Sequence, residues 1–391
     1  MKHNFPKSLY LHIPFCKRRC FYCDFAITTG GKKLKQQYVD VLCQEIALTV
    51  QEIPPSAPLE TIFLGGGTPS LLSVSQLAQI FETIAQEFAI ASNAEISLEA
   101  NAGTVSLETL RDYRRLGVNR ISLGAQAFQQ ELLDLCGRGH SVSEIYEAVS
   151  AIKQAGFENF NLDLISGLPN QTMADWQTSL KEAIALEPTH LSIYDLTIEE
   201  GTAFEKRYQA GAKPLPTDDL TVEMYIFAHE MLTSMGYEHY EISNYAKPSY
   251  QIRHNLTYWH NQPFYGMGMG ATSYINRQRI DRPRKMREYL EAIALWQTSG
   301  IKFTAPILEP VEELIDTLMQ GLRLAEGLSL KGLQANYGTE LSDCALQILY
   351  PYQNQQWVKL VQESDDLRIM LVTPEGWLFS DIIIADLYEN L

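Results

Sequence analysis

The chain has 391 residues, of which 46% are hydrophobic and 20% are charged, and its formal net charge is −16. This length exceeds one ordinary core and favours two or three domains, one of them large enough for a barrel. No apolar run of about 18 residues occurs, so we expect no membrane span. The acidic balance argues against nucleic-acid binding, which needs a basic face. We expect a cytoplasmic protein, because the first residues lack a signal peptide's apolar core and six scattered cysteines fit a reducing compartment.

Three cysteines, Cys16, Cys20 and Cys23, follow a first predicted strand with the spacing C-x3-C-x2-C. An odd number of thiols this close together is unsuited to a disulfide framework. A zinc knuckle needs a fourth Cys or His at short spacing, and none lies just downstream of Cys23. The spacing and the aromatic flanks favour a four-iron cluster over zinc or unrelated buried thiols. Three thiolates on such a cluster leave the fourth iron open to a small molecule.

Strand-like and helical segments alternate along the first 236 residues. Apolar strand patterns occur at 10–15, 61–64, 95–99, 120–124, 160–165 and 190–196, and helical patterns occur near 35–52, 75–88, 107–116, 142–155, 174–186 and 220–235. Ser141 with Glu144 and Thr172 with Asp175 have capping-box spacing, which marks two helix starts. Strands separated by helices pair in parallel through right-handed crossovers. Six such units predict an α/β fold with a partial, TIM-like (β/α)6 barrel, although a doubly wound open sheet fits the same pattern.

Polar residues end several of these apolar strands. Gly66, Gly67 and Thr68 follow the second strand, Glu99 ends the third, Gln126 follows the fourth, and the fifth carries Asp163. Glycines let the backbone approach a ligand, or they simply form a tight turn. Each polar residue alone could be an exposed strand end. Because a barrel keeps its chemistry at the C-terminal ends of the strands, the set predicts one shared site.

The cysteine motif resembles the signature of the radical S-adenosylmethionine (SAM) superfamily, in which the open iron chelates SAM and passes it one electron. The segments GGGTP, ISLEAN, ISLGAQAF, CGRGH and LDLISGLP are similar to elements of the oxygen-independent coproporphyrinogen III oxidase family. The resemblance implies a [4Fe-4S] cluster on the three cysteines. It also implies a SAM site lined by Tyr10, Tyr22, Gly66, Gly67, Thr68, Glu99, Gln126, Arg138 and Asp163. A carboxylate can hold ribose hydroxyls, Arg138 can pair with the SAM carboxylate, and Tyr22 can pack on adenine.

Residues 237–300 are rich in Tyr, His and Gly and contain the segment HNLTYW at 254–259. Imidazole is a common axial ligand of heme iron and aromatic faces pack on the macrocycle, but a lone histidine more often makes a structural hydrogen bond. HNxxYW resembles the heme-linked segment of HemW-type heme chaperones, which are relatives of the oxidase. The resemblance implies heme binding through His254, Asn255, Tyr258 and Trp259.

Six cations against one Asp occur between Arg277 and Arg287. We expect a solvated surface loop that leads into a helix; the alternative is a patch for propionates or for an acidic electron donor. In the last part, a helical segment precedes two apolar runs that flank Thr373-Pro374-Glu375-Gly376, a hairpin signal. This predicts a small α+β, winged-helix-like domain similar to the C-terminal domain of the same family. We therefore expect three parts, at residues 1–236, 237–300 and 301–391.

Two departures from the oxidase bear on function. Phe25 stands where the oxidase carries a further cysteine, and the ending CDF is shared with the chaperone branch; the segment before the first strand is also short. The resemblance therefore implies a heme chaperone, without catalytic residues, that binds the cluster, SAM and heme and delivers heme to apoproteins, some of them membrane-associated. A flavodoxin or ferredoxin-type protein would donate electrons. The alternative is an oxygen-independent coproporphyrinogen III oxidase, an enzyme that decarboxylates propionates.

Overall fold

A nine-stranded sheet dominates the computed structural model, which describes residues 5–301 and 305–391. The strand order is β7-β8-β6-β5-β4-β3-β2-β1-β9, and β1 to β6 are parallel neighbours in sequence order. The strands are β1 (Ser8–Ile13), β2 (Leu59–Gly66), β3 (Ile90–Asn101), β4 (Arg120–Gln126), β5 (Phe160–Ser166), β6 (His190–Asp195), β7 (Glu238–Glu241), β8 (Asn244–Ala246) and β9 (Tyr265–Met267).

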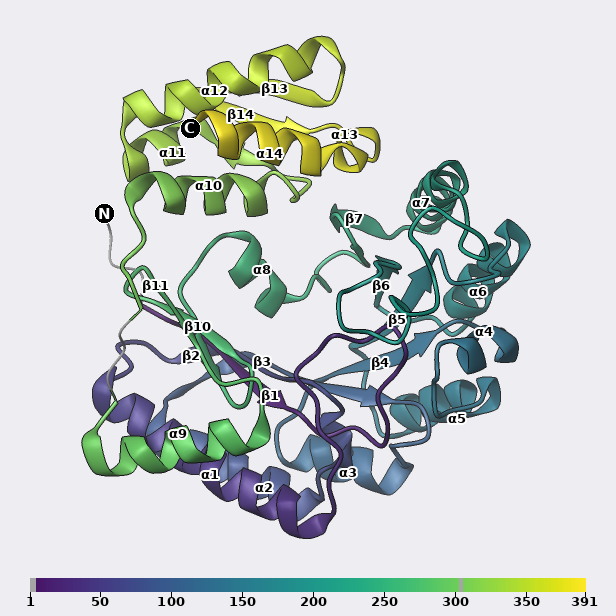
Figure 1. Cartoon of the computed structure of the whole chain (residues 1–391), viewed down its shortest axis with the longest axis vertical. Helices are drawn as coiled ribbons and strands as arrows, with labels where there is room; N and C mark the ends of the chain where they lie inside the picture. Colours follow the sequence, from purple (N-terminus) through teal and green to yellow (C-terminus); the bar gives the residue numbers. More distant parts are fainter. Residues whose placement is uncertain (1–4, 302–304) are drawn as a thin grey trace.

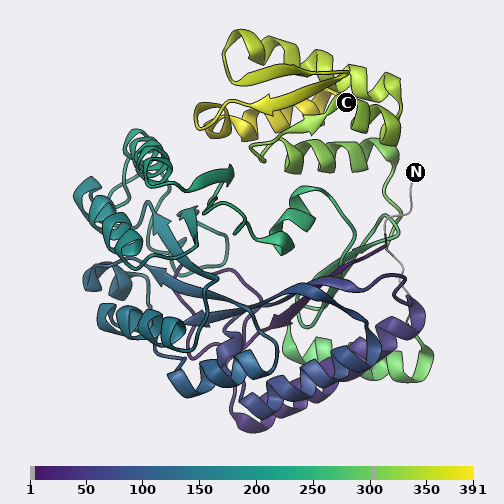
Figure 2. The ribbon, with the colours of Figure 1, turned by 180° about the vertical axis from the view of Figure 1, so that it is seen from behind.

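Helices connect the parallel strands and cover the convex side of the curved sheet (Figures 1 and 2). They are α1 (Lys32–Glu52), the short 3-10 helix η1 (Pro69–Leu71), α2 (Val74–Glu87), α3 (Leu107–Arg115), α4 (Gln130–Leu135), α5 (Val142–Gln154), α6 (Met173–Ala185) and α7 (Asp218–Ser234). The six strand-and-helix units confirm the predicted (β/α)6 partial barrel. The two predicted capping boxes are present, with Ser141 and Thr172 each bonded to the backbone three residues on.

Residues 237–300 add strands at both edges of this sheet. β7 and β8 form an antiparallel extension beside β6, while β9 pairs in parallel with β1. Between them lies α8 (Arg253–Trp259), which Figure 1 shows on the concave side of the sheet, opposite the connecting helices. The hairpin β10 (Thr272–Ile275) and β11 (Gln278–Asp281) and the helix α9 (Met286–Ser299) follow. The segment is thus joined to the barrel by backbone hydrogen bonds, and its boundaries as a domain remain a prediction.

The C-terminal part forms a small α+β unit with a second hydrophobic core, which includes Leu318, Leu349 and Trp377. Its three strands pair in the antiparallel order β12-β14-β13. The elements are α10 (Pro310–Gly321), β12 (Leu328–Ser329), α11 (Leu330–Tyr337), α12 (Thr339–Asn354), β13 (Val358–Glu363), β14 (Asp366–Leu371), α13 (Glu375–Leu378) and α14 (Ser380–Asn390). Helices followed by a hairpin agree with the predicted winged-helix-like architecture.

The hairpin of this unit is not where the sequence predicted it. The turn lies at Ser364 and Asp365, between β13 and β14, and Ser364 adopts a positive φ of 49°. The predicted turn, residues 373–376, instead leads into α13. The reason is the period of burial: Ser380, Ile383 and Leu387 are buried at separations of three and four residues, which is helical rather than alternating spacing.

Among the helices of the described residues, none combines the length and apolar character required to cross a membrane.

Candidate functional site

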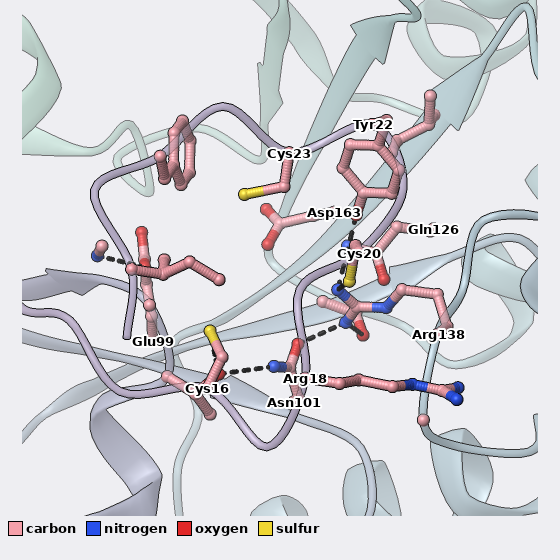
Figure 3. A pocket seen from close by; sticks show the side chains of 18 of the residues that line it. Cys16, Arg18, Cys20, Tyr22, Cys23, Glu99, Asn101, Gln126, Arg138 and Asp163 are labelled. Carbon is pink, nitrogen blue, oxygen red and sulfur yellow. Dashed lines mark hydrogen bonds between the residues drawn. The ribbon is translucent and has the colours of Figure 1, made fainter. Parts of the chain in front are cut away.

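A pocket of about 380 Å³ opens at the C-terminal ends of the parallel strands. We call it the cysteine pocket, because the loop after β1 places Cys16, Cys20 and Cys23 on its wall (Figure 3). Its other walls come from the ends of β2 to β6. Eight of the nine residues predicted to line a SAM site border this pocket: Tyr22, Gly66, Gly67, Thr68, Glu99, Gln126, Arg138 and Asp163. Parallel strands bring six of them together because the carboxyl ends of the strands lie at the same rim. Tyr22 comes from the cysteine loop and Arg138 from the segment between α4 and α5.

The cysteine loop is fixed by backbone hydrogen bonds at both ends. The Cys16 amide donates to Thr28 O at 3.0 Å, and the Phe21 amide donates to Cys136 O at 3.0 Å. All six cysteines are free thiols. In Figure 3 the three sulfur atoms of the motif stand apart around the pocket rather than converging on one point. Burial raises the pKa of the Cys23 thiol to about 11, so thiolates here need a cation to stabilise them.

Arg138 lies at the centre of a hydrogen-bonded network beside the cysteines. Its guanidinium donates to Asn101 Oδ1, to Tyr22 Oη at 3.4 Å and to Cys20 Sγ at 3.5 Å. Asn101 in turn donates to Thr68 Oγ1 at 2.8 Å. The side chain is almost entirely buried, and its Nε has no hydrogen-bond partner among the residues that the structure describes. A buried donor without a partner on the wall of a pocket is suited to an acceptor on a ligand.

Gln126 ends β4 in a strained conformation. Its φ is 66°, in the left-handed region that residues other than glycine rarely adopt. The side chain is buried and lines the cysteine pocket, and within residues 5–301 and 305–391 its Oε1 atom has no hydrogen-bond partner. Strain and an unsatisfied buried oxygen both cost folding free energy. The fold therefore holds Gln126 in an orientation that leaves its Oε1 atom available to a donor group in the pocket.

Two half-buried carboxyl groups, Glu99 and Asp163, face the same pocket (Figure 3). Burial, aided by the charge of Asp163, raises the pKa of Glu99 to about 8. Burial likewise raises the pKa of Asp163 to about 6, although Asn161 and Ser122 donate hydrogen bonds to it. The site thus carries two carboxyl groups whose charge depends on what occupies the pocket.

Gly66, the last residue of β2, and Gly67, which follows it, also have a packing role. A side chain at Gly66 would collide with the His12 ring, and one at Gly67 would collide with the backbone oxygens of Ile13 and Phe15. The Gly66 amide donates to Glu99 Oε2 at 2.9 Å. These glycines therefore let β2 pack against the start of the cysteine loop and orient Glu99, besides bordering the pocket.

Tyr10, the ninth predicted SAM residue, borders a second pocket of about 450 Å³. We call it the aromatic pocket. It shares Asp24, Phe25, Gly66 and Glu99 with the cysteine pocket, and its other lining residues are Tyr10, His12, Ala26, Tyr258, Phe264, Gly270, Ala271, Thr272 and Arg284. The Tyr10 hydroxyl bonds to His12 Nδ1 at 3.0 Å. The two pockets are therefore neighbours that meet at Glu99 and at Phe25, whose side chain is 56% exposed.

The predicted heme segment forms α8, and its histidine is enclosed. His254 is 1% exposed, and both its ring nitrogens are hydrogen-bonded, Nδ1 to Thr61 Oγ1 at 2.7 Å and Nε2 to Tyr258 Oη at 2.8 Å. Phe63 stacks on the imidazole, and the Glu95 carboxylate accepts a hydrogen bond from the His254 backbone amide. Asn255 and Trp259 do not border either pocket described above, whereas Tyr258 borders the aromatic pocket. His254 in this conformation has no ring nitrogen available for iron.

The cations between Arg277 and Arg287 do not form one free patch. Arg282 makes a fully buried pair with Glu45 at 2.7 Å. The pairs Arg277–Glu313, Arg279–Asp316, Lys285–Glu288 and Arg287–Glu291 have separations of 3.3 Å or less. Arg284 differs in the distance to its carboxylate partner, because the Asp24 oxygen is 3.9 Å away. Its Nη2 donates to the Asp24 carbonyl at 2.7 Å.

Sequence reasoning missed several polar residues of the cysteine pocket. Asn101, Tyr194 and Asp195 border it, and Asn161 donates to Asp163 at 2.5 Å. Two of them had a signal in the sequence. Asn101 lies two residues after Glu99 and Asn161 two residues before Asp163, so the period of two along a strand puts each pair on one face. Tyr194 and Asp195 occupy the end of β6, where a barrel places site residues.

Comparison with known proteins identifies the family. Residues 10–183 match the model of the radical SAM superfamily. The heme chaperone HemW of Synechocystis sp. is 41% identical over 404 residues, covering 99% of this chain and 97% of that protein. HemW of Lactococcus lactis is 32% identical, covering 95% and 94%. The solved structure of coproporphyrinogen III oxidase (HemN) from Escherichia coli superposes with a TM-score of 0.84 at 23% identity, covering 99% of this chain and 91% of that one, which supports the fold. The chain belongs to the radical SAM family of HemW heme chaperones.

Proposed function

We propose that this protein is a heme chaperone that binds a [4Fe-4S] cluster, SAM and heme and delivers heme to apoproteins. The observation that carries the proposal is the similarity to HemW of Synechocystis sp., which extends over 99% of this chain. The pocket of free thiols and unsatisfied buried polar atoms supports the cluster and SAM. Because both features lie in one site, the proposal accounts for the geometry and for the family together.

The cluster would be held by Cys16, Cys20 and Cys23. Their sulfur atoms stand apart around the pocket (Figure 3), as a cubane requires when each thiolate binds a different iron atom. The bound cluster supplies a one-electron donor with one iron open to SAM. Thr68 Oγ1, 3.6 Å from Cys16 Sγ, and the Arg138 guanidinium, 3.5 Å from Cys20 Sγ, would hydrogen-bond two of the thiolates and stabilise their charge.

SAM would occupy the cysteine pocket beside the cluster, bordered by Tyr22, Gly66, Gly67, Thr68, Glu99, Gln126, Arg138 and Asp163. The unpartnered Gln126 Oε1 and Arg138 Nε offer an acceptor and a charged donor, which suits the ammonium and carboxylate groups of SAM. The carboxylates of Glu99 and Asp163 can accept hydrogen bonds from the ribose hydroxyls of SAM or balance its positive charge. Tyr10 would lie beside the SAM site rather than in it, because it borders the aromatic pocket, which shares Glu99 with the cysteine pocket.

Heme would be bound near α8, through a site that includes His254, Asn255, Tyr258 and Trp259. The aromatic pocket supports this location, because Tyr258 of α8 borders it together with Phe25 and Phe264. Aromatic side chains pack on a planar macrocycle. Phe25 at the junction of the two pockets also favours a chaperone over the oxidase, whose family carries a further cysteine at that position.

The partners would be heme-accepting apoproteins, some of them membrane-associated, and a flavodoxin or ferredoxin-type electron donor, all in the cytoplasm. Most cations of the 277–287 stretch are paired within the chain. We therefore expect cluster reduction by such a donor to depend only weakly on salt between 50 and 300 mM. Stopped-flow measurement of the reduction rate would test this expectation. A rate that falls steeply with salt would instead indicate that residues 277–287 dock the donor.

An anaerobic heme titration of the cluster-containing protein, followed by its Soret band, tests the function. We expect saturation near one heme per chain, followed by transfer of that heme to a heme-free cytochrome or globin apoprotein. Turnover of coproporphyrinogen with SAM and a reductant is the parallel assay. If heme binding does not saturate and coproporphyrinogen is turned over, the chaperone function is rejected in favour of the oxidase activity.

A further inference from the structure

A row of buried polar side chains crosses the sheet next to the cysteine pocket. The strand register places Ser122 of β4, Asn161 of β5 and His190 of β6 opposite one another. Asp163 lies two residues beyond Asn161, so the two side chains share one face of β5. Asn161 and His190 are 0% exposed and border neither pocket described above. Because branched apolar residues usually fill a barrel interior, a buried polar row that leads to a pocket carboxyl requires an explanation.

The row belongs to a continuous chain of hydrogen bonds that ends at Asp163. The amide of Ile252, the residue before α8, donates to Tyr240 Oη at 3.2 Å, and that hydroxyl lies 2.9 Å from His190 Nε2. His190 Nδ1 lies 2.6 Å from Asn161 Oδ1, and Asn161 Nδ2 donates to Asp163 Oδ1 at 2.5 Å. The orientation of the pocket carboxyl therefore depends on groups that lie outside the pocket.

The groups at the ends of each bond determine which one donates. An ionised carboxylate only accepts, so the Asn161 amide points its Nδ2 atom at Asp163 and its Oδ1 atom at His190. His190 Nδ1 then carries the hydrogen, because two acceptors that face each other repel. Burial, together with the charge of Arg120, lowers the pKa of His190 well below its ordinary value, so the ring is neutral. Its Nε2 atom accepts the Tyr240 hydroxyl, and every group of the chain has a partner.

His190 is the group that keeps the Asn161 amide from turning over. Ser122 and Ser192 also lie within 3.1 Å of Asn161 Nδ2, but a hydroxyl can donate as well as accept and would tolerate either orientation. A neutral imidazole whose Nε2 atom accepts a hydrogen bond can only donate at Nδ1. If the amide turned over, its oxygen would face the Asp163 carboxylate, and the two acceptors would repel.

From this chain we infer that His190 is a positioning residue of the SAM site, which fixes the Asn161 amide and through it holds the Asp163 carboxylate in place for SAM. The inference rests on the proposed SAM site and extends it to a residue that does not touch the ligand. Because the chain is complete before SAM enters, the carboxylate is already oriented, and less ordering free energy is lost on binding.

Two substitutions separate the roles of the two ring nitrogens. His190→Asn keeps an amide donor at the position of Nδ1–H and gives up the contact with Tyr240. His190→Gln reaches the position of Nε2 and leaves Asn161 without its donor. In anaerobic calorimetric titrations of the cluster-containing protein, we expect SAM to bind about tenfold more weakly to His190→Gln and at most about threefold more weakly to His190→Asn.

A histidine with a merely structural role would give a different pattern. Both His190 substitutions alter a buried site, so both should lower the thermal unfolding temperature by similar amounts. The control is His239→Gln, which changes another buried histidine, bonded to His229 Nδ1 at 2.8 Å, that does not border the cysteine pocket. It should also lower the unfolding temperature but keep wild-type SAM affinity. Equal losses of SAM affinity in the two His190 variants, or wild-type affinity in His190→Gln, would overturn the inference.

The tautomer of His190 can be read in the wild-type chain by nitrogen-15 NMR of histidine-labelled protein with the cluster oxidised. Its resonances, assigned by their shift in Tyr240→Phe, should show a protonated Nδ1 and a bare Nε2, with and without SAM. The opposite tautomer would leave Nδ1 with no hydrogen to donate to Asn161 and would contradict the inference. A wild-type chain that binds no SAM would instead refute the proposed SAM site, so the two failures are distinguishable.

Discussion

The cysteine pocket and the surroundings of His254 are both buried and polar, but they differ in how their polar groups are satisfied. In the pocket, Gln126 Oε1 and Arg138 Nε lack partners, and the carboxyl of Glu99 has a pKa raised to about 8 by burial. Around His254, both ring nitrogens and the amide have partners within 3.1 Å. The first region keeps polar atoms available to a ligand, whereas the polar atoms around His254 are paired within the chain.

This difference predicts whether removing a polar side-chain group by mutation changes ligand affinity or the stability of the fold. Removing a group that awaits a ligand should lower the affinity for that ligand and spare the fold. Removing a group that is already paired should leave its partner buried and unsatisfied, which lowers the free energy of unfolding.

The largest expected effect is loss of the cluster. Cys16→Ala, Cys20→Ala or Cys23→Ala should each abolish the brown chromophore, because a cubane held by two thiolates loses a ligand it cannot replace. Iron and sulfide analysis after anaerobic reconstitution is the measurement. Cys43→Ala and Cys344→Ala, away from the pocket, are the matched controls and should keep wild-type iron content. Full iron in any of the three motif variants would remove that cysteine from the ligand set.

The next effect concerns pH. Because the pKa of Glu99 is about 8 in the folded chain and 4.5 is its ordinary value, the folded state binds more protons than the unfolded state between these values. The free energy of unfolding should therefore fall as pH rises from 4.5 to 8, by at most about 1.4 kcal/mol per pH unit for one proton. Urea unfolding of the SAM-free protein at pH 5.5, 6.5 and 7.5 measures the slope. Glu99→Gln should flatten it, and an unaltered slope would contradict the assignment.

In the His254 region, Thr61→Val keeps the side-chain shape but removes the partner of Nδ1. We expect a loss of about 1–3 kcal/mol in the free energy of unfolding, since a buried donor is left unsatisfied. SAM affinity and iron content should not change. A variant that is as stable as wild type would show that His254 has another partner available.

The smallest expected effect, that of Gln126→Leu, tests the comparison between the cysteine pocket and the His254 region most directly. Gln126→Leu removes a buried oxygen that has no partner, so stability without SAM should stay level or rise while SAM affinity falls about tenfold, or about 1.4 kcal/mol. The matched control is Gln171→Leu, a buried glutamine bonded to Leu168 N and Ile165 O, which should lose about 1–3 kcal/mol of stability. Calorimetric SAM titration and thermal unfolding separate the two. Equal destabilisation of both variants would contradict the distinction between the regions.

The sequence by itself determined the six strand-and-helix units and the strand ends that carry site residues, although an open sheet fitted the same pattern. Period-two and helical patterns, with capping boxes at Ser141 and Thr172, identify the six strand-and-helix units. Parallel pairing then brings every strand end to one rim, so Glu99, Gln126 and Asp163 could be placed together without coordinates. The cysteine spacing is equally local, and it predicts the cluster motif directly.

Only the tertiary structure decided which polar groups are paired and which pocket each residue borders. His254 and Gln126 look alike as polar residues in apolar surroundings, yet one is bonded to Thr61 and Tyr258, 193 and 4 residues away along the chain, and the other to nothing at its Oε1. The Arg277 to Arg287 stretch looks uniformly cationic, but its partners come from α1, α9 and α10. The pairings with Thr61, Glu45, Glu313 and Asp316 depend on which distant segments meet after folding, and no local pattern encodes them. Tyr258, Glu288 and Glu291 lie only three or four residues from their partners, which is ordinary helical spacing.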